Sequence, residues 1–228
     1  MAQLSIIIPT LNAVPVLGPT LAALAQIEGA GLVKELIVAD GGSVDETRQA
    51  ATETGAVLVE TEAGRGVQLQ AGAAAARGDW FLFLHADTVL AEGWSDAVRA
   101  FIDAAGTVPR AGYFRFALDD TAAEARRVES LVRWRNRLLA LPYGDQGLLI
   151  ARAHFEAIGG YRNYPLMEDV DIVRRIGRRR LRSINATATT SAAKYRAEGY
   201  WSRPARNLLC LAFYYLGLPK SLIRKVYG

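Results

Sequence analysis

Carboxylate, amide, hydroxyl and imidazole side chains follow three apolar runs of the sequence, at the point where each run ends. One run ends in Pro9-Thr10-Leu11-Asn12, another in Asp40, and a third in His85-Ala86-Asp87. A carboxylate that ends an apolar strand is costly to remove from water unless it has a partner or a task. Such groups can bind a divalent cation or activate a hydroxyl group. We therefore take Asp40 and Asp87 as candidate functional residues.

Other polar residues are open to a second interpretation. Ser43, Asp45 and Thr88 lie near the same run ends, and these residue types are equally typical of helix caps and turns. Further along the chain, Asp145-Gln146 precedes an apolar run and Glu168-Asp169 opens a helical pattern. The adjacent side chains of that pair would point about 100° apart on a helix, so only one of them can readily face a ligand.

The elements that would position these groups alternate between two periods. The first half has short apolar runs typical of strands covered on both faces, separated by stretches with helical spacing. The strands are expected at 4–8, 35–39, 56–59 and 80–84, and the helices at 17–26, 44–54 and 66–77. This alternation predicts a mainly parallel, Rossmann-like α/β sheet flanked by helices, in which ligands bind beyond the carboxyl ends of the strands.

The second half is less regular. Its patterns predict strands at 111–118 and 147–151 and helices at 121–141 and 167–176. No Pro/Gly/Ser-rich linker divides the chain, so we expect one domain over residues 1–228. Its parts are a nucleotide-binding half at about 1–110, an acceptor half at 111–185 and a basic helical C-terminal extension at 186–228.

Composition narrows the class of protein. With 228 residues, 51% hydrophobic and 22% charged, the chain is not disordered, collagen-like or low in complexity. The net charge of +4 is unevenly distributed: residues 1–173 hold 14 basic and 22 acidic residues, whereas residues 174–228 hold 13 basic residues and one acidic residue, Glu198. A basic tail attracts phosphate in nucleic acids, anionic lipids or small molecules.

The compartment is predicted from what the sequence lacks. One cysteine, Cys210, lies in an apolar run, which indicates a buried thiol and a reducing compartment. The start of the chain has no basic segment followed by a signal-length apolar run. The longest uncharged apolar stretch, 208–219, is shorter than the roughly 20 residues of a membrane-spanning helix. We expect a cytoplasmic protein, and peripheral attachment to the inner face of the membrane stays open.

Five segments in order resemble a family 2 glycosyltransferase of the GT-A fold. They are Pro9-Thr10-Leu11-Asn12, Asp40-Gly41-Gly42-Ser43-Val44-Asp45-Glu46-Thr47, Gly64-Arg65-Gly66, His85-Ala86-Asp87 and Glu168-Asp169. Each is weak alone, but five in order at expected strand ends and helix starts are specific. The segments around residues 83–88, 143–147 and 165–171 are most similar to a small bacterial subgroup labelled as arsenosugar-biosynthesis glycosyltransferases.

The resemblance implies a metal-dependent, inverting hexosyltransferase with a nucleotide-sugar donor, UDP-sugar by default, and an unknown acceptor. Asp87 corresponds to the last Asp of the family's D-x-D motif, which holds Mn²⁺ or Mg²⁺ against the donor diphosphate. His85 replaces the first Asp of that motif, and it either contacts the donor or ligates the metal. The resemblance assigns Asp40 to the nucleotide base, with Pro9, Thr10, Asn12 and Arg65 in the same donor site.

For the acceptor side, the resemblance implies that Asp169 is the general base. Glu168 then positions substrate or caps a helix, and Asp145 and Gln146 are candidates for sugar or acceptor hydroxyl groups. In the basic tail, Lys194 or Arg196 would reach the donor diphosphate. The same tail is also compatible with a solvated helix face or with attachment to an anionic membrane.

Three other functions remain open. A nucleotidyltransferase normally has a Gly-rich loop with Arg or Lys after its first strand, which Pro9-Thr10-Leu11-Asn12 lacks. An inactive relative that only binds a sugar nucleotide is suggested by the change at His85, although Asp87 and Asp169 are retained. A nucleic-acid-binding module is remote, because the acidic body would repel a polyanion and the basic run 174–182 has no aromatic residue.

Overall fold

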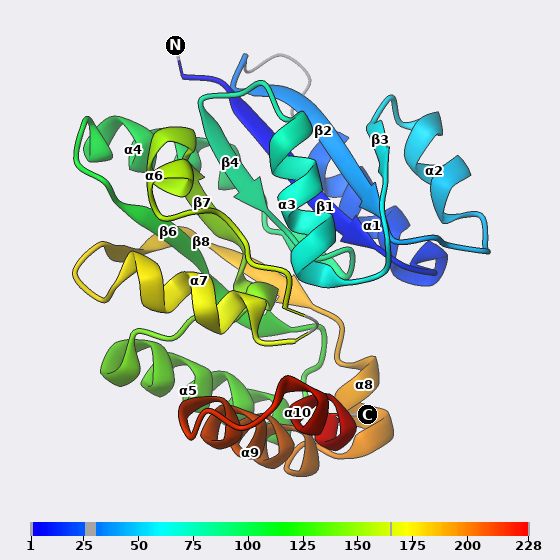
Figure 1. The fold of residues 1–228 in the computed structure, drawn as a ribbon, viewed down its shortest axis with the longest axis vertical. Coiled ribbons are helices and arrows are strands. Elements are labelled where there is room, and N and C mark those ends of the chain that lie inside the picture. Colours follow the sequence, from blue (N-terminus) through cyan, green and yellow to red (C-terminus); the bar gives the residue numbers. More distant parts are fainter. Residues whose placement is uncertain (1, 26–30, 165, 228) are drawn as a thin grey trace.

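The computed structural model describes residues 2–25, 31–164 and 166–227, and Figure 1 shows their arrangement. Gln26, in the predicted first helix, and Pro165, in one motif, lie outside the described residues. The elements are β1 (Leu4–Thr10), α1 (Val14–Ala25), β2 (Val33–Asp40), α2 (Thr47–Glu53), β3 (Val57–Glu60), α3 (Arg65–Ala75), β4 (Trp80–Phe83), β5 (Thr88–Leu90), α4 (Trp94–Ala105), β6 (Ala111–Leu118), α5 (Ala123–Leu139), a 3₁₀ turn η1 (Gly144–Gln146), β7 (Leu148–Ala151), α6 (Arg152–Ala157), α7 (Glu168–Ile176), β8 (Leu181–Thr190), α8 (Ala193–Glu198), α9 (Ser202–Tyr215) and α10 (Lys220–Tyr227).

One sheet runs through the domain in the order β3-β2-β1-β4-β7-β6-β8-β5. The neighbours among β3, β2, β1 and β4 are parallel, as the alternating pattern predicts. Beyond β4 the sheet is mixed: β7 is antiparallel to β4 and β6, β8 is parallel to β6, and β5 is antiparallel to β8. The protein is therefore a single α/β domain with a mixed central sheet.

Strand register brings the polar run ends together. Thr10, at the end of β1, pairs with Asp40, at the end of β2. Phe83, at the end of β4, pairs with Leu148 at the start of the antiparallel β7, so the 3₁₀ turn before β7 lies next to the residues after β4. Residues from distant parts of the chain thus meet at one edge of the sheet.

A second antiparallel pair adds the tail to that edge. Thr88 pairs with Thr190, and their hydroxyl groups are hydrogen-bonded at 2.9 Å. The chain beyond β8 therefore leaves the sheet beside Asp87, whose backbone carbonyl accepts the N–H of Ser191. Helix α8 follows directly.

Helices cover both faces of the sheet (Figure 1), and their apolar side chains pack against it. On one face, side chains of α1 and α4 such as Leu17, Leu21 and Val98 pack on β1 and β4. On the other face, side chains of α3, α6 and α7 such as Leu69 and Phe155 form a second cluster. Burial on both faces explains why these strands are nearly continuous apolar runs.

The tail differs from its predicted form. The sequence pattern did not identify β8, which runs through position 186, where the predicted extension begins, and the helices start at Ala193. Arg178, Arg179 and Arg180 lie in a turn and not on a helix. Cys210 is buried in the second cluster, as predicted, and burial raises the pKa of its thiol. Within the described residues, every helix is too short or too polar to span a membrane.

Candidate active site

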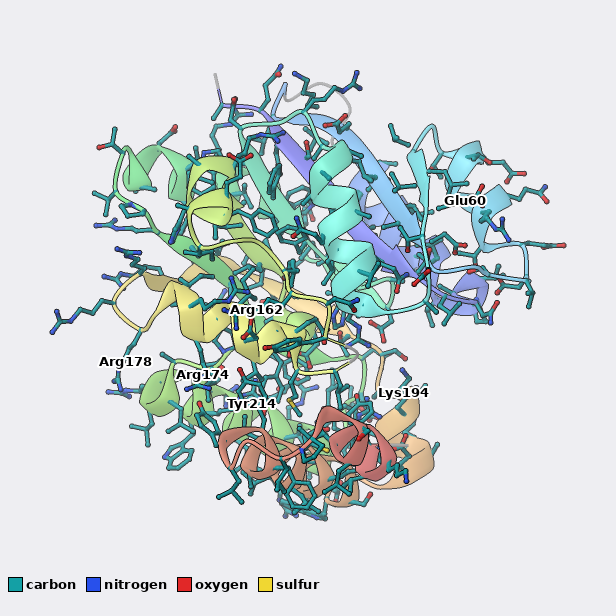
Figure 2. The ribbon with its side chains drawn as sticks, viewed as in Figure 1. Glu60, Arg162, Arg174, Arg178, Lys194 and Tyr214 are labelled. Carbon is teal, nitrogen blue, oxygen red and sulfur yellow. The ribbon has the colours of Figure 1, made fainter. Side chains whose placement is uncertain are left out.

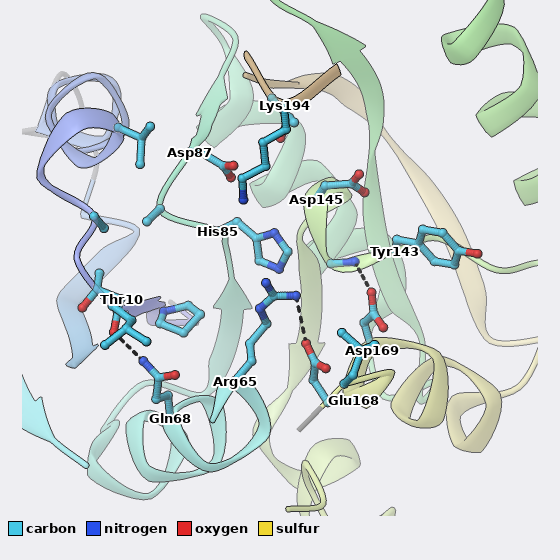
Figure 3. Close-up of a pocket in the computed structure, with 18 of the residues that line it drawn as sticks. Thr10, Arg65, Gln68, His85, Asp87, Tyr143, Asp145, Glu168, Asp169 and Lys194 are labelled. Atoms are coloured by element: carbon cyan, nitrogen blue, oxygen red, sulfur yellow. Dashed lines mark hydrogen bonds and ion pairs between the residues drawn. The ribbon is translucent and has the colours of Figure 1, made fainter. Parts of the chain in front are cut away.

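A cavity of about 640 Å³ opens at the carboxyl ends of the strands (Figure 3). Small-molecule sites commonly have this size and this place in open α/β sheets. Ten of the residues singled out from the sequence line it: Pro9, Thr10, Asn12, Arg65, His85, Asp87, Asp145, Glu168, Asp169 and Lys194. The other three, Asp40, Gln146 and Arg196, lie outside it.

Asp40 lies behind the cavity wall, which differs from its predicted place beside a nucleotide base. It is fully buried, and one oxygen accepts the hydroxyl groups of Thr10 and Ser43 while the other accepts the N–H groups of Gly42 and Ser43. Burial alone would raise the pKa of Asp40, but these hydrogen bonds outweigh burial and lower it. Asp40 therefore shapes the loop after β2 and holds Thr10, which does line the cavity.

Gln146 and Arg196 are engaged elsewhere. The buried Gln146 amide donates to the carbonyl of Phe114, and its oxygen accepts bonds from Arg135 and Asn136. Arg196 is half exposed and pairs with Asp119 and Asp120 on the outer side of α8. Neither side chain is available to a ligand in the cavity.

Asp169 is held in a fixed orientation at the start of α7. Its Oδ2 accepts the N–H of Gly144 at 2.9 Å, and its Oδ1 accepts the N–H of Val170 at 2.7 Å. Met167, just before the helix, has a positive φ of 66°, a strained conformation for a residue with a side chain. The turn before β7 and the first turn of α7 together aim this carboxylate into the cavity (Figure 3).

Glu168 faces Arg65 across the cavity floor. Its Oε1 lies 3.4 Å from Arg65 Nη1, and the buried Oε2 has no hydrogen-bond partner among the described residues. Burial raises the pKa of Glu168 to about 7, against the opposing effect of Arg65 and with a further increase from Asp169. Near neutral pH this carboxyl group therefore exchanges between two protonation states.

His85 lies at the centre of the cavity, between Arg65 and Asp87. Burial, together with the charge on Arg65, lowers the pKa of His85 to about 4, so the imidazole is neutral at neutral pH. A Cβ on Gly144 would lie 2.5 Å from His85 Nε2, so glycine at 144 leaves the space that the ring occupies. Lys194 extends from α8 toward Asp87 and His85 (Figure 3).

Two further oxygens in the cavity wall are buried without a partner among the described residues, Asp145 Oδ1 and Asn207 Oδ1. Burial raises the pKa of Asp145 to about 6, while Arg135 opposes the rise and Asp169 adds to it. Buried hydrogen-bond acceptors of this kind are costly unless a ligand or water donates to them. The wall is thus suited to a ligand that carries hydroxyl groups.

Several lining residues were not found from the sequence. Gln68 on α3 is buried, and its amide donates to the carbonyls of Thr10 at 2.6 Å and Ala39 at 2.9 Å, which joins β1 and β2 to α3. In the sequence, Gln68 is marked only as a polar residue within an Ala-rich helical stretch. Tyr143 belongs to a segment that carries the family resemblance but was not singled out as a site residue. Four residues of the tail also line the cavity and had no local signal: Tyr195, Arg203, Asn207 and Tyr227.

The residues fit a metal ion only in combination with a bound ligand. Among the described residues, no group of three or more His, Cys, Asp or Glu side chains is placed to hold a metal ion. A divalent cation that shares its ligands with phosphate oxygens needs only one or two carboxylates from the protein. Asp87, whose carboxylate makes no hydrogen bond or ion pair with a described side chain, and the neutral His85 meet that requirement.

The sequence model described as Glycosyl transferase family 2 matches residues 5–154. This match covers more than half of the chain, so the protein belongs to family 2 of the glycosyl transferases. The matched part includes β1 to β7, with Thr10, Arg65, His85 and Asp87. Asp169 and the tail lie beyond it.

Individual relatives agree with this assignment. Glucosyl-3-phosphoglycerate synthase of Mycolicibacterium smegmatis is 36% identical over 94 residues, which span 37% of this chain and 31% of that protein. The similarity therefore covers less than a third of the relative.

Solved structures extend the likeness over the whole fold. Glucosyl-3-phosphoglycerate synthase from Mycobacterium tuberculosis, in complex with Mn²⁺, uridine diphosphate and glucosyl-3-phosphoglycerate, has a TM-score of 0.63 and 20% identity over 96% of this chain and 81% of that chain. S. aureus TarS 1-349 has a TM-score of 0.66 and 14% identity over 99% of this chain and 69% of that chain. These neighbours confirm the GT-A fold expected from the sequence.

Proposed function

We propose that the protein is a metal-dependent inverting glycosyltransferase that moves a hexose from a UDP-sugar to a hydroxyl group of an acceptor. The observation that carries the proposal is the convergence of Asp87 and the oriented carboxylate of Asp169 on one cavity, from strand and helix ends that are 82 positions apart in the sequence. Family membership supports sugar transfer as the reaction class. Assignment to the arsenosugar-biosynthesis subgroup remains a prediction from the motifs.

The donor would lie along the ends of β1 and β4. Pro9, Thr10 and Asn12 border the side of the cavity behind which Asp40 orders the loop. Arg65 and Lys194 supply positive charge for the diphosphate, and Lys194 has no ion pair among the described residues. Structures of the M. tuberculosis synthase with uridine diphosphate and Mn²⁺ or Mg²⁺ favour UDP as the nucleotide.

Asp87, with His85 beside it, would hold Mn²⁺ or Mg²⁺. When bound, such an ion neutralises the negative charge that develops on the diphosphate leaving group. Lys194 reaches the same region and adds a second positive charge. The neutral state of His85 leaves a nitrogen lone pair free for the ion or for a hydrogen bond from the donor.

Asp169 would act as the general base. Its two oxygens are held by N–H groups, which leaves further lone pairs to accept the acceptor's hydroxyl proton. The acceptor oxygen then attacks the anomeric carbon opposite the diphosphate, the bond to the diphosphate breaks, and the proton remains on Asp169. A single displacement of this kind inverts the anomeric configuration.

The acceptor would be a polyhydroxylated molecule. Asp145 Oδ1 and Asn207 Oδ1 both need a hydrogen-bond donor, and hydroxyl groups supply one each. Asn207 lies on α9, outside the segment that the family model matches. A site built to bond a hydroxyl group discriminates strongly against molecules that lack it.

A thermal-shift screen of nucleotide sugars, with and without Mn²⁺, tests the proposal. We expect a UDP-sugar to raise the melting temperature only with metal, and Asp87→Ala to remove that shift. Asp103→Ala, at an exposed position on α4, is the matched control and should behave like the wild type. Stabilisation by a nucleoside triphosphate alone, followed by release of pyrophosphate, would instead identify a nucleotidyltransferase. UDP-sugar binding without turnover by any hydroxyl acceptor would identify an inactive relative.

A further inference from the structure

Helix α9 presents an apolar face to solvent. Leu208 and Tyr215 are seven residues apart and therefore on one side of α9, and Leu216 directly follows the helix. These three side chains are 65%, 51% and 74% exposed, and Trp201 precedes the helix at 55% exposed. The opposite side of α9 carries the buried Cys210 and packs into the core, so the orientation of the exposed face is fixed. Apolar groups gathered on a surface in this way mark interaction sites.

Helix α5 carries a second face of the same kind. Leu131, Trp134 and Leu138 are spaced three and four residues apart and are therefore on one side of the helix. Their exposed fractions are 47%, 60% and 45%. The other side of α5, with Ala125 and Val128, packs against β6 and α8.

A hydrogen bond joins the segments before the two helices, and at the other end both helices contact α7 and the turn after it. Before they begin, the Tyr200 hydroxyl donates to Asp120 Oδ2 at 2.5 Å. At the other end, Arg178 donates to the carbonyl of Leu138 at 2.8 Å, and Arg174 from the same basic segment lies over the ring of Tyr215. Both helices lie at the end of the molecule farthest from the N-terminus (Figures 1 and 2). We call their exposed apolar side chains and the adjoining arginines the α5–α9 face.

Positive charge surrounds these apolar groups. The exposed arginines of α5, of the turn after α7 and of the start of β8 make no ion pair with any described residue: Arg127, Arg133, Arg137, Arg178, Arg179 and Arg182. Glu198, the acidic residue of the tail, is already engaged by Arg203 and Arg206. The face therefore combines exposed apolar side chains with arginines that have no carboxylate partner among the described residues.

We propose that the α5–α9 face binds the surface of a bilayer that contains anionic phospholipid. Lipid phosphates pair with arginine, while Leu and Trp side chains enter the boundary between headgroups and acyl chains. A second copy of the chain fits less well, because a two-fold contact between identical faces would set arginines against arginines. No described helix is long enough to span, so α5 and α9 lie along the surface.

This mode of attachment also determines how close the cavity lies to the lipid surface. Arg203 and Asn207 on α9 line the cavity, whereas Leu208 and Tyr215 on the same helix are exposed. One helix, about 10–12 Å across, therefore separates the cavity from the lipid surface. Transfer would take place next to the headgroups.

Co-sedimentation of the full chain with vesicles tests the proposal. We expect binding to vesicles of phosphatidylcholine mixed with phosphatidylglycerol, weaker binding as salt is added, and little binding to phosphatidylcholine alone. Trp134→Glu with Leu208→Glu should reduce binding at least tenfold. Val108→Glu is the matched control, because Val108 is 51% exposed in the loop after α4, outside the face.

Circular dichroism and donor-induced thermal shifts establish that each variant is folded. Arg127→Gln with Arg137→Gln, which changes no packed side chain, should weaken vesicle binding by about 25-fold. The proposal would be overturned if the wild-type protein did not bind anionic vesicles, or if the glutamate variants bound them as well as the control does. A dimer of the wild type in light scattering, split by Leu208→Glu without any vesicle binding, would also overturn it and assign the face to a second copy.

Discussion

The cavity and the α5–α9 face use arginine in opposite ways. Beside the cavity, Arg65 pairs with Glu168, and Arg175 pairs with Asp171 on the helix that carries Asp169. On the face, Arg127 and Arg137 have no acidic partner among the described residues. The paired arginines fix the positions of carboxylates, whereas the unpaired ones add charge to a surface. Changing a single atom should therefore have a large effect on transfer activity in the cavity and a small effect on vesicle binding at the face.

The largest effect should come from Asp169→Asn, which keeps the shape of the side chain but cannot take up the acceptor's proton. General-base catalysis is typically worth 10² to 10⁴ in rate, so we expect transfer to fall by about 10³. UDP-sugar binding, measured by calorimetry, should stay within about twofold of the wild type. Full transfer activity in this variant would remove Asp169 from the catalytic role.

The next effect concerns the space around His85. In Gly144→Ala the new Cβ would lie 2.5 Å from His85 Nε2, so the ring must move. We expect metal-dependent donor affinity to fall about 10- to 100-fold, as is typical when the support of a ligand is disturbed. Gly18→Ala, where nothing lies within 4 Å of the added carbon, is the control. Unchanged donor affinity in Gly144→Ala would show that His85 has no part in donor or metal binding.

A smaller, pH-dependent effect is expected at Glu168. Its pKa of about 7 means that the wild type has a neutral Glu168 carboxyl group below pH 7 and a charged one above it. Glu168→Gln resembles the neutral form at every pH. The two proteins should therefore have similar kcat/KM at pH 6 and diverge by up to about tenfold as the pH rises to 8. A constant ratio across this range would contradict the raised pKa.

The smallest effect should come from one arginine of the face. Arg137→Gln should weaken binding to anionic vesicles by about fivefold and leave transfer to a soluble acceptor unchanged. A loss of transfer equal to the loss in Asp169→Asn would erase the contrast between the two regions. Vesicle co-sedimentation measures binding, and an assay with a soluble acceptor measures transfer, both on the same preparation of the variant.

The parallel half of the fold could be predicted because its signals are local. β1, β2, β3 and β4 are apolar runs between helices, and parallel strands bring their carboxyl ends to one edge. The meeting of Thr10, His85 and Asp87 follows from this rule. The sequence pattern was therefore sufficient to predict that these residues meet, on the side of the cavity to which we assign the donor.

The other half depends on contacts between distant segments. The hydroxyl bond between Thr88 and Thr190 joins residues 102 positions apart, and no local pattern marks it. β8 and the places of Lys194 and Asn207 follow from that pairing. Asp40 lies behind the cavity wall, where its carboxylate accepts the N–H groups of Gly42 and Ser43. A carboxylate at a strand end serves equally well to bind its own loop or a ligand, and the sequence pattern does not separate these two uses.

The most direct test of the catalytic account is the anomeric configuration of the first product. With the UDP-α-sugar that the thermal-shift screen selects, and a hydroxyl acceptor or water, NMR can read the product before its anomers equilibrate. A single displacement assisted by Asp169 predicts a β-configured product in the wild type. An α-configured product would show that the sugar is transferred with retention and would contradict the proposed mechanism.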